Sequence, residues 1–278
     1  MTSDQVESFG GSLIQHGPLN DRAYVMKLGG DIAPEVAAYV NALAITKGYS
    51  KIFAKVPGAA RPAFTKMDFI EEARIPGLFK RKEDGCFLSK FLSAERESEK
   101  HAHTVAEVLQ SALQKNGEVA EVKLIDNCTC RTMRKCDVEE MARLYSQVFA
   151  SYPFPIHDPD YLASTMDDSL IYFGIWDGGR LIALSSAEVD FDGSNAEMTD
   201  FATLPEYRGQ GLATYLLREM ESGIRQIGIQ TAYTIARAYS FGMNITFAKQ
   251  GYIHGGTLVN NTQISGALES MNIWHKHL

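Results

Sequence analysis

The sequence contains no long hydrophobic run and few cysteines, and each shortage excludes a class of protein. No stretch of about 18 apolar residues occurs, so we expect no transmembrane helix and no membrane partner. Residues 1–18 are polar and lack the apolar centre of a secretory signal peptide. The four cysteines, Cys86, Cys128, Cys130 and Cys136, are too few for a disulfide framework. Cys128 and Cys130 are spaced too closely for a zinc knuckle, so we expect reduced thiols, no metal and a cytoplasmic protein.

Basic residues are also fewer than acidic ones. The chain has 27 Lys and Arg against 34 Asp and Glu, which gives a net charge of −7 at pH 7. Nucleic-acid backbones are bound through basic patches, so this balance argues against a nucleic-acid partner. An acidic surface is compatible with a small cationic substrate, although simple solubility also accounts for it.

The sequence lacks the G-x-G-x-x-G fingerprint of dinucleotide-binding folds and carries a different glycine-rich loop. Arg208, Gly211 and Ala213 give an R-x-x-G-x-A spacing. Gly209 and Gly211 allow a tight turn that brings backbone N–H groups close to a ligand. A helix that starts there directs its unpaired N–H groups and its positive dipole end at the same place. Such a loop can bind a pyrophosphate with backbone atoms alone, but turn chemistry by itself fits an ordinary glycine turn equally well.

The residues around the loop favour the pyrophosphate site. Residues 197–203 alternate roughly between apolar and polar side chains, as in a strand, and an apolar face recurs at helical spacing from Leu212 to Ile224. This strand–loop–helix unit resembles motif A of the GNAT acetyltransferase superfamily, in which the loop holds the pyrophosphate of acetyl-CoA. The resemblance implies acetyl-CoA as co-substrate. The cofactor contacts that it implies are Phe201, Ala202, Thr203, Arg208, Gly209, Gln210, Gly211, Leu212 and Ala213.

The chain from about residue 131 onward has the element order of one complete GNAT domain. The expected strands are 131–134, 171–176, 180–189, 197–203, 231–236 and a stretch around residues 273–274. The expected helices begin at Asp137, where Glu140 gives a capping-box spacing, near residue 159, after the glycine loop, and at Asn244. These elements predict an α+β fold. We identify residues 127–278 as a catalytic domain of the GNAT acyltransferase fold, a mixed and largely antiparallel sheet flanked by helices.

The first half of the chain contains a segment whose residue pattern is similar to one in this domain. Phe64 to Ile70 matches Phe247 to Ile253 in pattern, and both segments follow a strand-like run, which is 51–56 in the first half. Nothing nearby supplies R-x-x-G-x-A. We interpret residues 1–126 as a smaller, degenerate GNAT-like α/β half-domain without a cofactor of its own, with 90–114 as a helical connector. A chance match of seven residues is the alternative.

Acetyl transfer from a thioester to an amine requires a neutral amine, a polarised carbonyl and correct positioning. In the superfamily the thioester lies between the strand before the glycine loop and the next strand. This places Glu197 and Asp200 near the reacting centre, and Glu188 on the preceding strand is a third carboxylate. Each is a candidate for the base or for a contact with the cationic amine, and each could equally be a solvated strand residue.

Two further candidates follow from position in the superfamily pattern. Asn244 occupies the place where many GNAT proteins contact the cofactor through an Asn. The usual general acid is a Tyr, and the corresponding residue here is Phe247, which has no proton to donate. Tyr239 is a nearby substitute; alternatively the thiolate leaves unaided, because a thiol pKa of about 8.5 makes it a fair leaving group.

The acceptor pocket is expected between the first two helices of the domain. There Tyr152 and Phe154 offer flat apolar walls, although aromatics that merely pack in a helix-terminating loop are an alternative. The 152–156 loop, the 199–203 strand and the incomplete first half together resemble the β-lysine N6-acetyltransferase family. The resemblance implies acetylation of the side-chain (N6) amine of a small cationic amino acid, β-lysine, by direct attack of the neutral amine. The product would be the compatible solute N6-acetyl-β-lysine.

Two other classes of function stay open. One is a GNAT enzyme that acts on another small amine or on a protein amine, which needs an open groove for a peptide. The other is a non-catalytic module that binds acetyl-CoA and needs no base. A monomer and a homodimer are both compatible with the sequence.

Overall fold

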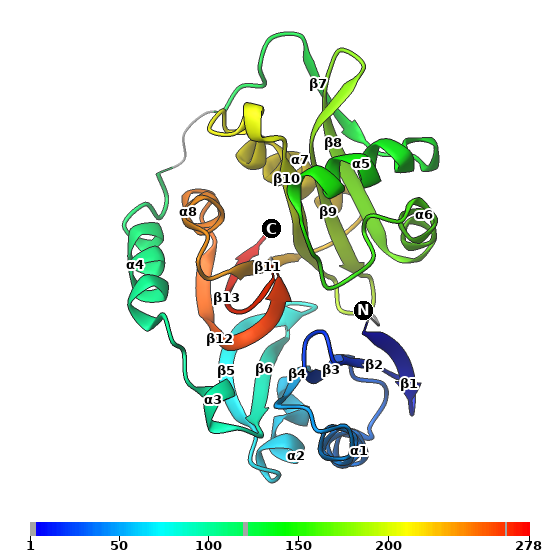
Figure 1. Ribbon diagram of the computed structural model, residues 1–278, viewed down its shortest axis with the longest axis vertical. Helices are drawn as coiled ribbons and strands as arrows, with labels where there is room; N and C mark the ends of the chain where they lie inside the picture. The colour runs from blue at the N-terminus through cyan, green and yellow to red at the C-terminus, as the bar shows by residue number, and fades with distance from the viewer. Residues whose placement is uncertain (1–3, 119–121, 265) are drawn as a thin grey trace.

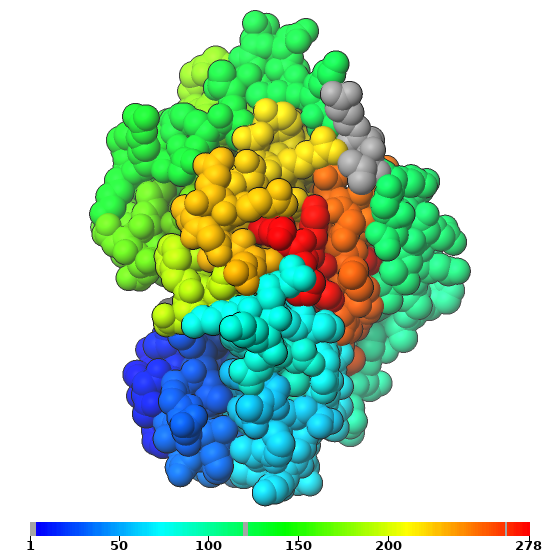
Figure 2. Space-filling model, turned by 180° about the vertical axis from the view of Figure 1, so that it is seen from behind, coloured from blue at the N-terminus to red at the C-terminus, as the bar shows by residue number. Residues whose placement is uncertain are grey.

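The computed structural model describes residues 4–118, 122–264 and 266–278, and its strands form one continuous sheet. The order of the strands is β1-β2-β3-β4-β6-β5-β12-β13-β11-β10-β9-β8-β7. The strands of the first half, blue to cyan in Figure 1, make the lower part of the molecule, and most strands of the second half lie above them. The two halves join through the pairing of β5 with β12. Figure 2 shows the cyan segment of the first half packed against the orange and red segment of the second.

The strands are β1 (Gln5–Phe9), β2 (Ser12–Gly17), β3 (Arg22–Lys27), β4 (Lys51–Pro57), β5 (Ile70–Phe79), β6 (Glu83–Phe91), β7 (Cys128–Thr132), β8 (Leu170–Asp177), β9 (Arg180–Asp190), β10 (Asn195–Thr203), β11 (Thr231–Arg237), β12 (Ile253–Ile264) and β13 (Ala267–His277). The helices are α1 (Ala33–Lys47), α2 (Arg61–Thr65), α3 (Ala94–Glu97), α4 (Ala102–Leu113), α5 (Val138–Val148), α6 (Pro159–Asp168), α7 (Leu212–Gln226) and α8 (Phe241–Lys249).

Local sequence signals explain where several helices begin and end. Asp158 caps α6 by accepting from the Asp160 amide, and Pro159 occupies the first helical position, where no N–H is needed. Ser240 caps α8 through the amide of Met243. Gly48 ends α1 in the left-handed conformation, with φ of 73°. These termini therefore follow from short-range chemistry.

The first half repeats the second half in element order and strand pairing. In the second half, β8, β9 and β10 are antiparallel neighbours, α7 crosses to the parallel strand β11, and α8 leads to the β12–β13 hairpin, with β13 beside β11. In the first half, β1, β2 and β3 are antiparallel, α1 crosses to the parallel strand β4, and α2 leads to the β5–β6 hairpin, with β6 beside β4. The halves meet at equivalent strands, β5 and β12.

The register of the strands matches as well. In the first half, Phe53 pairs with Ser89, and Ser89 pairs with Ile70. In the second half, Tyr233 pairs with His275, which pairs with Ile253. Ile70 and Ile253 end the two seven-residue segments whose patterns match in the sequence. The match therefore reflects a structural repeat, and the repeat extends further toward the N-terminus than the sequence indicated.

Four details differ from the sequence-based expectations. The strand expected over residues 131–134 is β7, which begins earlier, at Cys128, and ends at Thr132. Residues 90 and 91 complete β6, because their backbone pairs with β4, so the helical connector is shorter than 90–114. Asp137 does not cap α5 with its side chain; its carboxylate accepts from the Arg134 amide at 2.8 Å and pairs with Arg131 at 2.7 Å. The expected helix at Asn244 begins earlier, at Phe241. The proposed boundary after residue 126 falls between α4 and β7 and stays a prediction.

Buried side chains form three groups. One lies between α5 to α8 and the sheet of the second half, and another lies under α1 and α2 of the first half. The third joins the halves: Tyr24 and Phe53 from the first pack with Tyr233 and Met271 from the second. This shared core fixes the relative position of the two repeats, and the cavity described below lies beside it.

Candidate active site

The parallel strands β10 and β11 separate after three paired residues. They pair only over 195–197 and 231–233, although both strands continue beyond these residues. At the same place β10 bulges against β9, because its register shifts between Thr199 and Ala202. Asp200 lies in this bulge with a φ of 56°, a left-handed conformation that is costly for a residue with a side chain. Bulges of this kind often lie next to active sites.

A small cavity of about 90 Å³ occupies the opening between the two strands. Its walls include Phe201 from β10, Ala236 from β11 and Phe247 from α8. Phe201 packs edge-on against Phe247, with ring centroids 5.7 Å apart. Phe247, at the position of the usual acid, is thus an apolar wall of this opening.

The glycine-rich loop follows the end of β10. Gly209 and Gly211 have φ values of 78° and 76°, in the region that favours glycine, and Gly211 is the N-cap of α7. Arg208 Nε donates to the carbonyl of Thr203 at 3.2 Å, which ties the loop to the strand. The first N–H groups of α7 have no partner within the helix, so they are available to an anion. Backbone donors therefore lie close after the end of the strand that borders the opening.

A larger cavity of about 480 Å³ lies beside the opening, between the two halves of the chain. All three candidate carboxylates, Glu188, Glu197 and Asp200, line it, and so do Tyr152 and Phe154. The structure thus brings these five residues to the walls of one cavity. The two cavities share wall residues, which are Tyr152, Thr199, Asp200, Ile235, Ile264 and Met271. We call the larger one the acceptor cavity.

The first half of the chain supplies the opposite wall of the acceptor cavity. Arg22, Tyr24 and Lys55 line it from β3 and β4. Sequence reasoning missed these residues because none belongs to a motif. The repeat could have pointed to them, because β3 and β4 are the counterparts of β10 and β11. In the parallel pairings of the two halves, Tyr24 lies opposite Phe53 and Glu197 lies opposite Tyr233.

Asp200 is held by hydroxyl groups. The Tyr152 hydroxyl donates to Oδ1, Ser186 donates to Oδ2 at 2.5 Å, and Thr199 donates to Oδ1 at 3.3 Å. Burial raises the pKa of the Asp200 carboxyl, while these hydrogen bonds oppose the rise. Asp200 is therefore fixed in position, and much of its capacity to accept hydrogen bonds is in use.

Glu197 has a different environment. It lies directly opposite Glu188 in the β9–β10 pairing. Burial, and then repulsion by Glu188, raise the pKa of Glu197 to about 7, although Lys55 opposes this shift. Burial also raises the pKa of Glu188. Glu197 can therefore gain and lose a proton near neutral pH, as a general base must.

Two predicted site residues are placed elsewhere. The Tyr239 hydroxyl donates to Glu99 Oε1 at 2.7 Å and lines a separate cavity beside α3. Asn244 is fully buried: its amide donates to the carbonyls of Arg237 and Ser240, and its Oδ1 accepts from Asn272 and Trp274. Asn244 thus links α8 to β11 and β13. Its side chain has no free polar atom for the cofactor contact that the sequence predicted. Neither residue is grouped with the three carboxylates.

The model of the acetyltransferase (GNAT) family matches residues 138–252. The chain is 41% identical over 265 residues to the beta-lysine N(6)-acetyltransferase of Methanococcus maripaludis, which covers 95% of this chain and 96% of that protein. The chain belongs to the GNAT acetyltransferase family. This confirms the fold inferred from the sequence, the use of acetyl-CoA and the transfer of an acetyl group to an amine.

Two more relatives of this GNAT acetyltransferase match over nearly their full length. N-acetyltransferase YodP of Bacillus subtilis is 32% identical over 96% of each chain. The beta-lysine N(6)-acetyltransferase of Methanosarcina mazei is 31% identical over 88% of this chain and 97% of that protein. These alignments include the first half of the chain as well as the second.

The described residues supply no group of three or more His, Cys, Asp or Glu side chains that could hold a metal ion. Within the same residues, each helix is too short or too polar to cross a membrane.

Proposed function

We propose that this acetyltransferase acetylates the N6 amine of β-lysine by direct attack of the neutral amine. The observation that carries the proposal is the acceptor cavity, which is lined by five carboxylates, Asp4, Asp168, Glu188, Glu197 and Asp200, and by two cations, Arg22 and Lys55. Two relatives named beta-lysine N(6)-acetyltransferase support the same substrate. A diamino acid carries two ammonium groups and one carboxylate, so it needs partners of both signs when it leaves water.

Different residues of the acceptor cavity deprotonate, position and enclose the acceptor. Acetyl-CoA supplies an activated acetyl group on a thioester. Glu197 accepts a proton from the N6 ammonium, which leaves the amine neutral and nucleophilic. The amine nitrogen then bonds to the thioester carbonyl carbon, the C–S bond breaks, and the leaving CoA thiolate takes up the second proton that the nitrogen loses. Tyr152 and Asp200, joined by a hydrogen bond at the edge shared by the two cavities, position the amine near the opening. Phe154 and Tyr161 give the aliphatic chain an apolar wall.

The cavity favours a small acceptor over a protein amine. Its walls come from both halves of the chain and from the 152–156 loop, and its volume of about 480 Å³ suits a small molecule. Acetylation leaves one ammonium and one carboxylate, so the product has no net charge. We propose that it serves as a compatible solute in the cytoplasm, where acetyl-CoA is available.

A mass-spectrometric screen tests this function. Purified protein is incubated with acetyl-CoA and with β-lysine, α-lysine, ornithine, spermidine or a lysine-containing peptide. We expect a single acetyl group on N6 of β-lysine, formed faster than any other product. Faster acetylation of the peptide or of spermidine would contradict the proposed substrate, and acetyl-CoA binding without any product would point to a binding module.

A further inference from the structure

Arg22 is a buried cation that forms no ion pair within the described structure, although the charges of Asp4 and Glu197 in the same cavity act on it. Only 5% of its surface is exposed, and it lines the acceptor cavity. Nη1 donates to the carbonyl of Asn261 and to Thr262 Oγ1 at 3.2 Å, while Nη2 lies 3.5 Å from Gln15 Oε1. Nε has no hydrogen-bond partner among the described atoms. A buried, unsatisfied donor on a charged group is costly and calls for an explanation.

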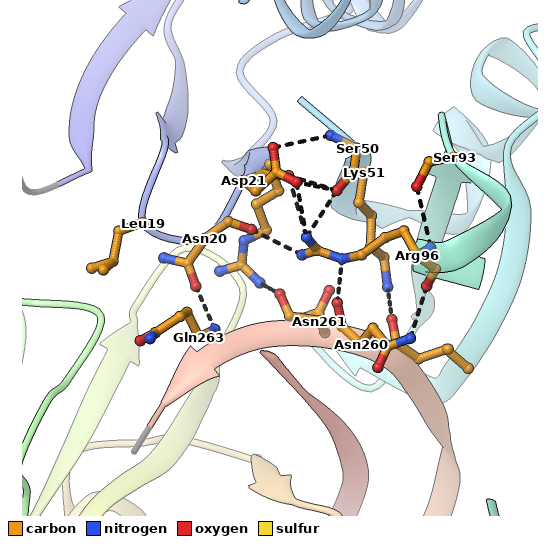
Figure 3. A network of polar contacts seen from close by, with 12 residues as sticks. Leu19, Asn20, Asp21, Ser50, Lys51, Ser93, Arg96, Asn260, Asn261 and Gln263 are labelled. Carbon is orange, nitrogen blue, oxygen red and sulfur yellow. Dashed lines mark hydrogen bonds and ion pairs between the residues drawn. The ribbon is translucent and has the colours of Figure 1, made fainter. Parts of the chain in front are cut away.

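Two neighbouring cations make a useful comparison, because both reach the same bulge of β12. Lys51 Nζ donates to the carbonyl of Val259 at 2.6 Å, and Arg96 Nε donates to that of Asn260 at 2.7 Å, as Figure 3 shows for Arg96. Each also has a carboxylate partner. Lys51 pairs with Glu72 at 2.9 Å, and Arg96 pairs with Asp21 at 3.5 Å. Arg22 is the third cation that donates to this bulge of β12, through the carbonyl of Asn261. Of the three cations, it is the one that lines the acceptor cavity.

A second unsatisfied atom lies next to Arg22. Asn261 is 1% exposed, lines the same cavity, and its Oδ1 has no hydrogen-bond partner among the described atoms. The backbone carbonyl of Asn261, by contrast, is held by Arg22. The cavity thus presents one unused donor with a positive charge and one unused acceptor close together. That pair is complementary to a carboxylate and an ammonium on neighbouring carbons.

The surroundings hold the guanidinium in place. It lies over the rings of Tyr24 and Phe53, 5.0 and 5.7 Å from their centroids. Burial lowers the pKa of Arg22 to about 10, so it still carries its charge at neutral pH. Arg22 and Asn261 line only the acceptor cavity, whereas Asp200 lines the strand opening as well. Arg22 therefore borders the acceptor cavity and is not among the residues that line the opening.

We propose that Arg22 binds the carboxylate of the diamino-acid acceptor through Nε, and that Asn261 Oδ1 accepts from the ammonium on its third carbon. This subsite rests on the proposed function. It explains how the enzyme distinguishes a diamino acid from a polyamine: the first places an anion against Arg22, and the second places a cation or a methyl group there. Attraction to one acceptor and repulsion of the other act together.

The test compares two acceptors that differ in the carboxylate alone, β-lysine and pentane-1,4-diamine. CoA release gives kcat/KM for each. We expect the wild-type protein to prefer β-lysine by at least about 10-fold in kcat/KM. Arg22→Gln should lower kcat/KM for β-lysine by about 10- to 100-fold and change kcat/KM for the diamine by no more than about threefold. Asn261→Ala, which keeps the backbone carbonyl for Arg22, should raise KM for β-lysine more than it lowers kcat.

Arg96→Gln is the matched control, because it removes a similar buried cation–carbonyl link outside the acceptor cavity. It should leave the preference for β-lysine over the diamine unchanged. A dead-end ligand, 3-aminohexanoate, carries the carboxylate and the third-carbon ammonium without N6. It should inhibit the wild-type protein competitively and the Arg22→Gln protein at least 10-fold more weakly.

Several outcomes would overturn the subsite while the proposed function stands. One is equal use of both acceptors by the wild-type protein. Another is an equal loss for both acceptors in Arg22→Gln, which would indicate a purely structural role. If Arg22→Gln does not fold, an Asn261→Ala protein with unchanged KM for β-lysine would overturn it instead. A wild-type protein that acetylates neither compound would contradict the proposed function itself.

Discussion

At the scale of single residues, two carboxylates on one strand have different properties because their neighbours differ. Asp200 accepts from three hydroxyl groups, whereas Glu197 faces Glu188 across the β9–β10 pairing. The hydroxyl groups stabilise the charged form of Asp200, and the second carboxylate destabilises the charged form of Glu197. From the sequence the two were equal candidates for the base. Burial raises the pKa of both carboxyls, to about 7 for Glu197, and three hydroxyl groups hold Asp200 in position.

Glu197→Gln should lower kcat about 100-fold or more, with a smaller change in KM. In the wild-type protein the rate should rise with pH until Glu197 is ionised, near pH 7, and then level off. The Gln variant lacks this base, so its rate should keep rising toward the pKa of the free amine, about 10. The measurement is kcat from pH 6 to 10. Asp200→Asn is the comparison, and a near-normal kcat in Glu197→Gln would remove Glu197 from the mechanism.

The same substitution should stabilise the folded protein at alkaline pH. Because the pKa of Glu197 is raised from 4.5 to about 7 on folding, the folded state binds the proton more tightly than the unfolded state does. The stability that the proton provides is present below pH 4.5 and is lost as the pH rises through 7. Glu197→Gln keeps a neutral side chain at every pH. We expect its Tm to exceed that of the wild-type protein by roughly 2–6 °C at pH 8 and to match it at pH 4.

At the scale of elements, the strand–loop–helix unit could be predicted because its signals are local. Gly209 and Gly211 adopt the left-handed conformations that the motif requires, and α7 starts where the apolar face begins. The roles of Arg22 and Asn244 could not be predicted. Arg22 meets residues about 240 positions away in the sequence, and Asn244 is saturated by β11, β13 and α8. Such roles depend on non-local pairing, which a single sequence does not reveal.

Gly211→Asp tests the loop. The new side chain adds strain at a φ of 76° and a negative charge at the N-terminus of α7, where the pyrophosphate is expected. We expect the Kd for acetyl-CoA, measured by calorimetry, to rise at least about 10-fold. Gly228→Asp is the matched control, because Gly228 follows the other end of α7 with a φ of 87° and a Cβ there meets no described atom within 4 Å. Equal affinities in the two folded variants would contradict the assigned loop.

At the scale of the whole molecule, the chain consists of two units with the same element order and strand pairing. The second unit retains the glycine loop over residues 204–211, between β10 and α7. The first has residues 28–32 between β3 and α1, with Ile32 as N-cap and no R-x-x-G-x-A. Its strands instead supply Arg22 and Lys55 to the acceptor cavity. Under the proposed function, the second unit binds the acetyl donor and the first completes the wall around the acceptor.

This division predicts one acetyl-CoA per chain. Asp31 and Glu35 flank the start of α1, where a pyrophosphate would have to bind, and acidic groups there already complement the helix dipole. Calorimetric titration should give a stoichiometry of one for the wild-type protein. If the first unit kept a weak site of its own, Gly211→Asp would still show one residual site with unchanged affinity. We expect no such site, because the only loop in the described chain with the R-x-x-G-x-A pattern is the one that this substitution disrupts. A stoichiometry of two in the wild-type protein would show that the shorter β3–α1 connection can also bind the cofactor.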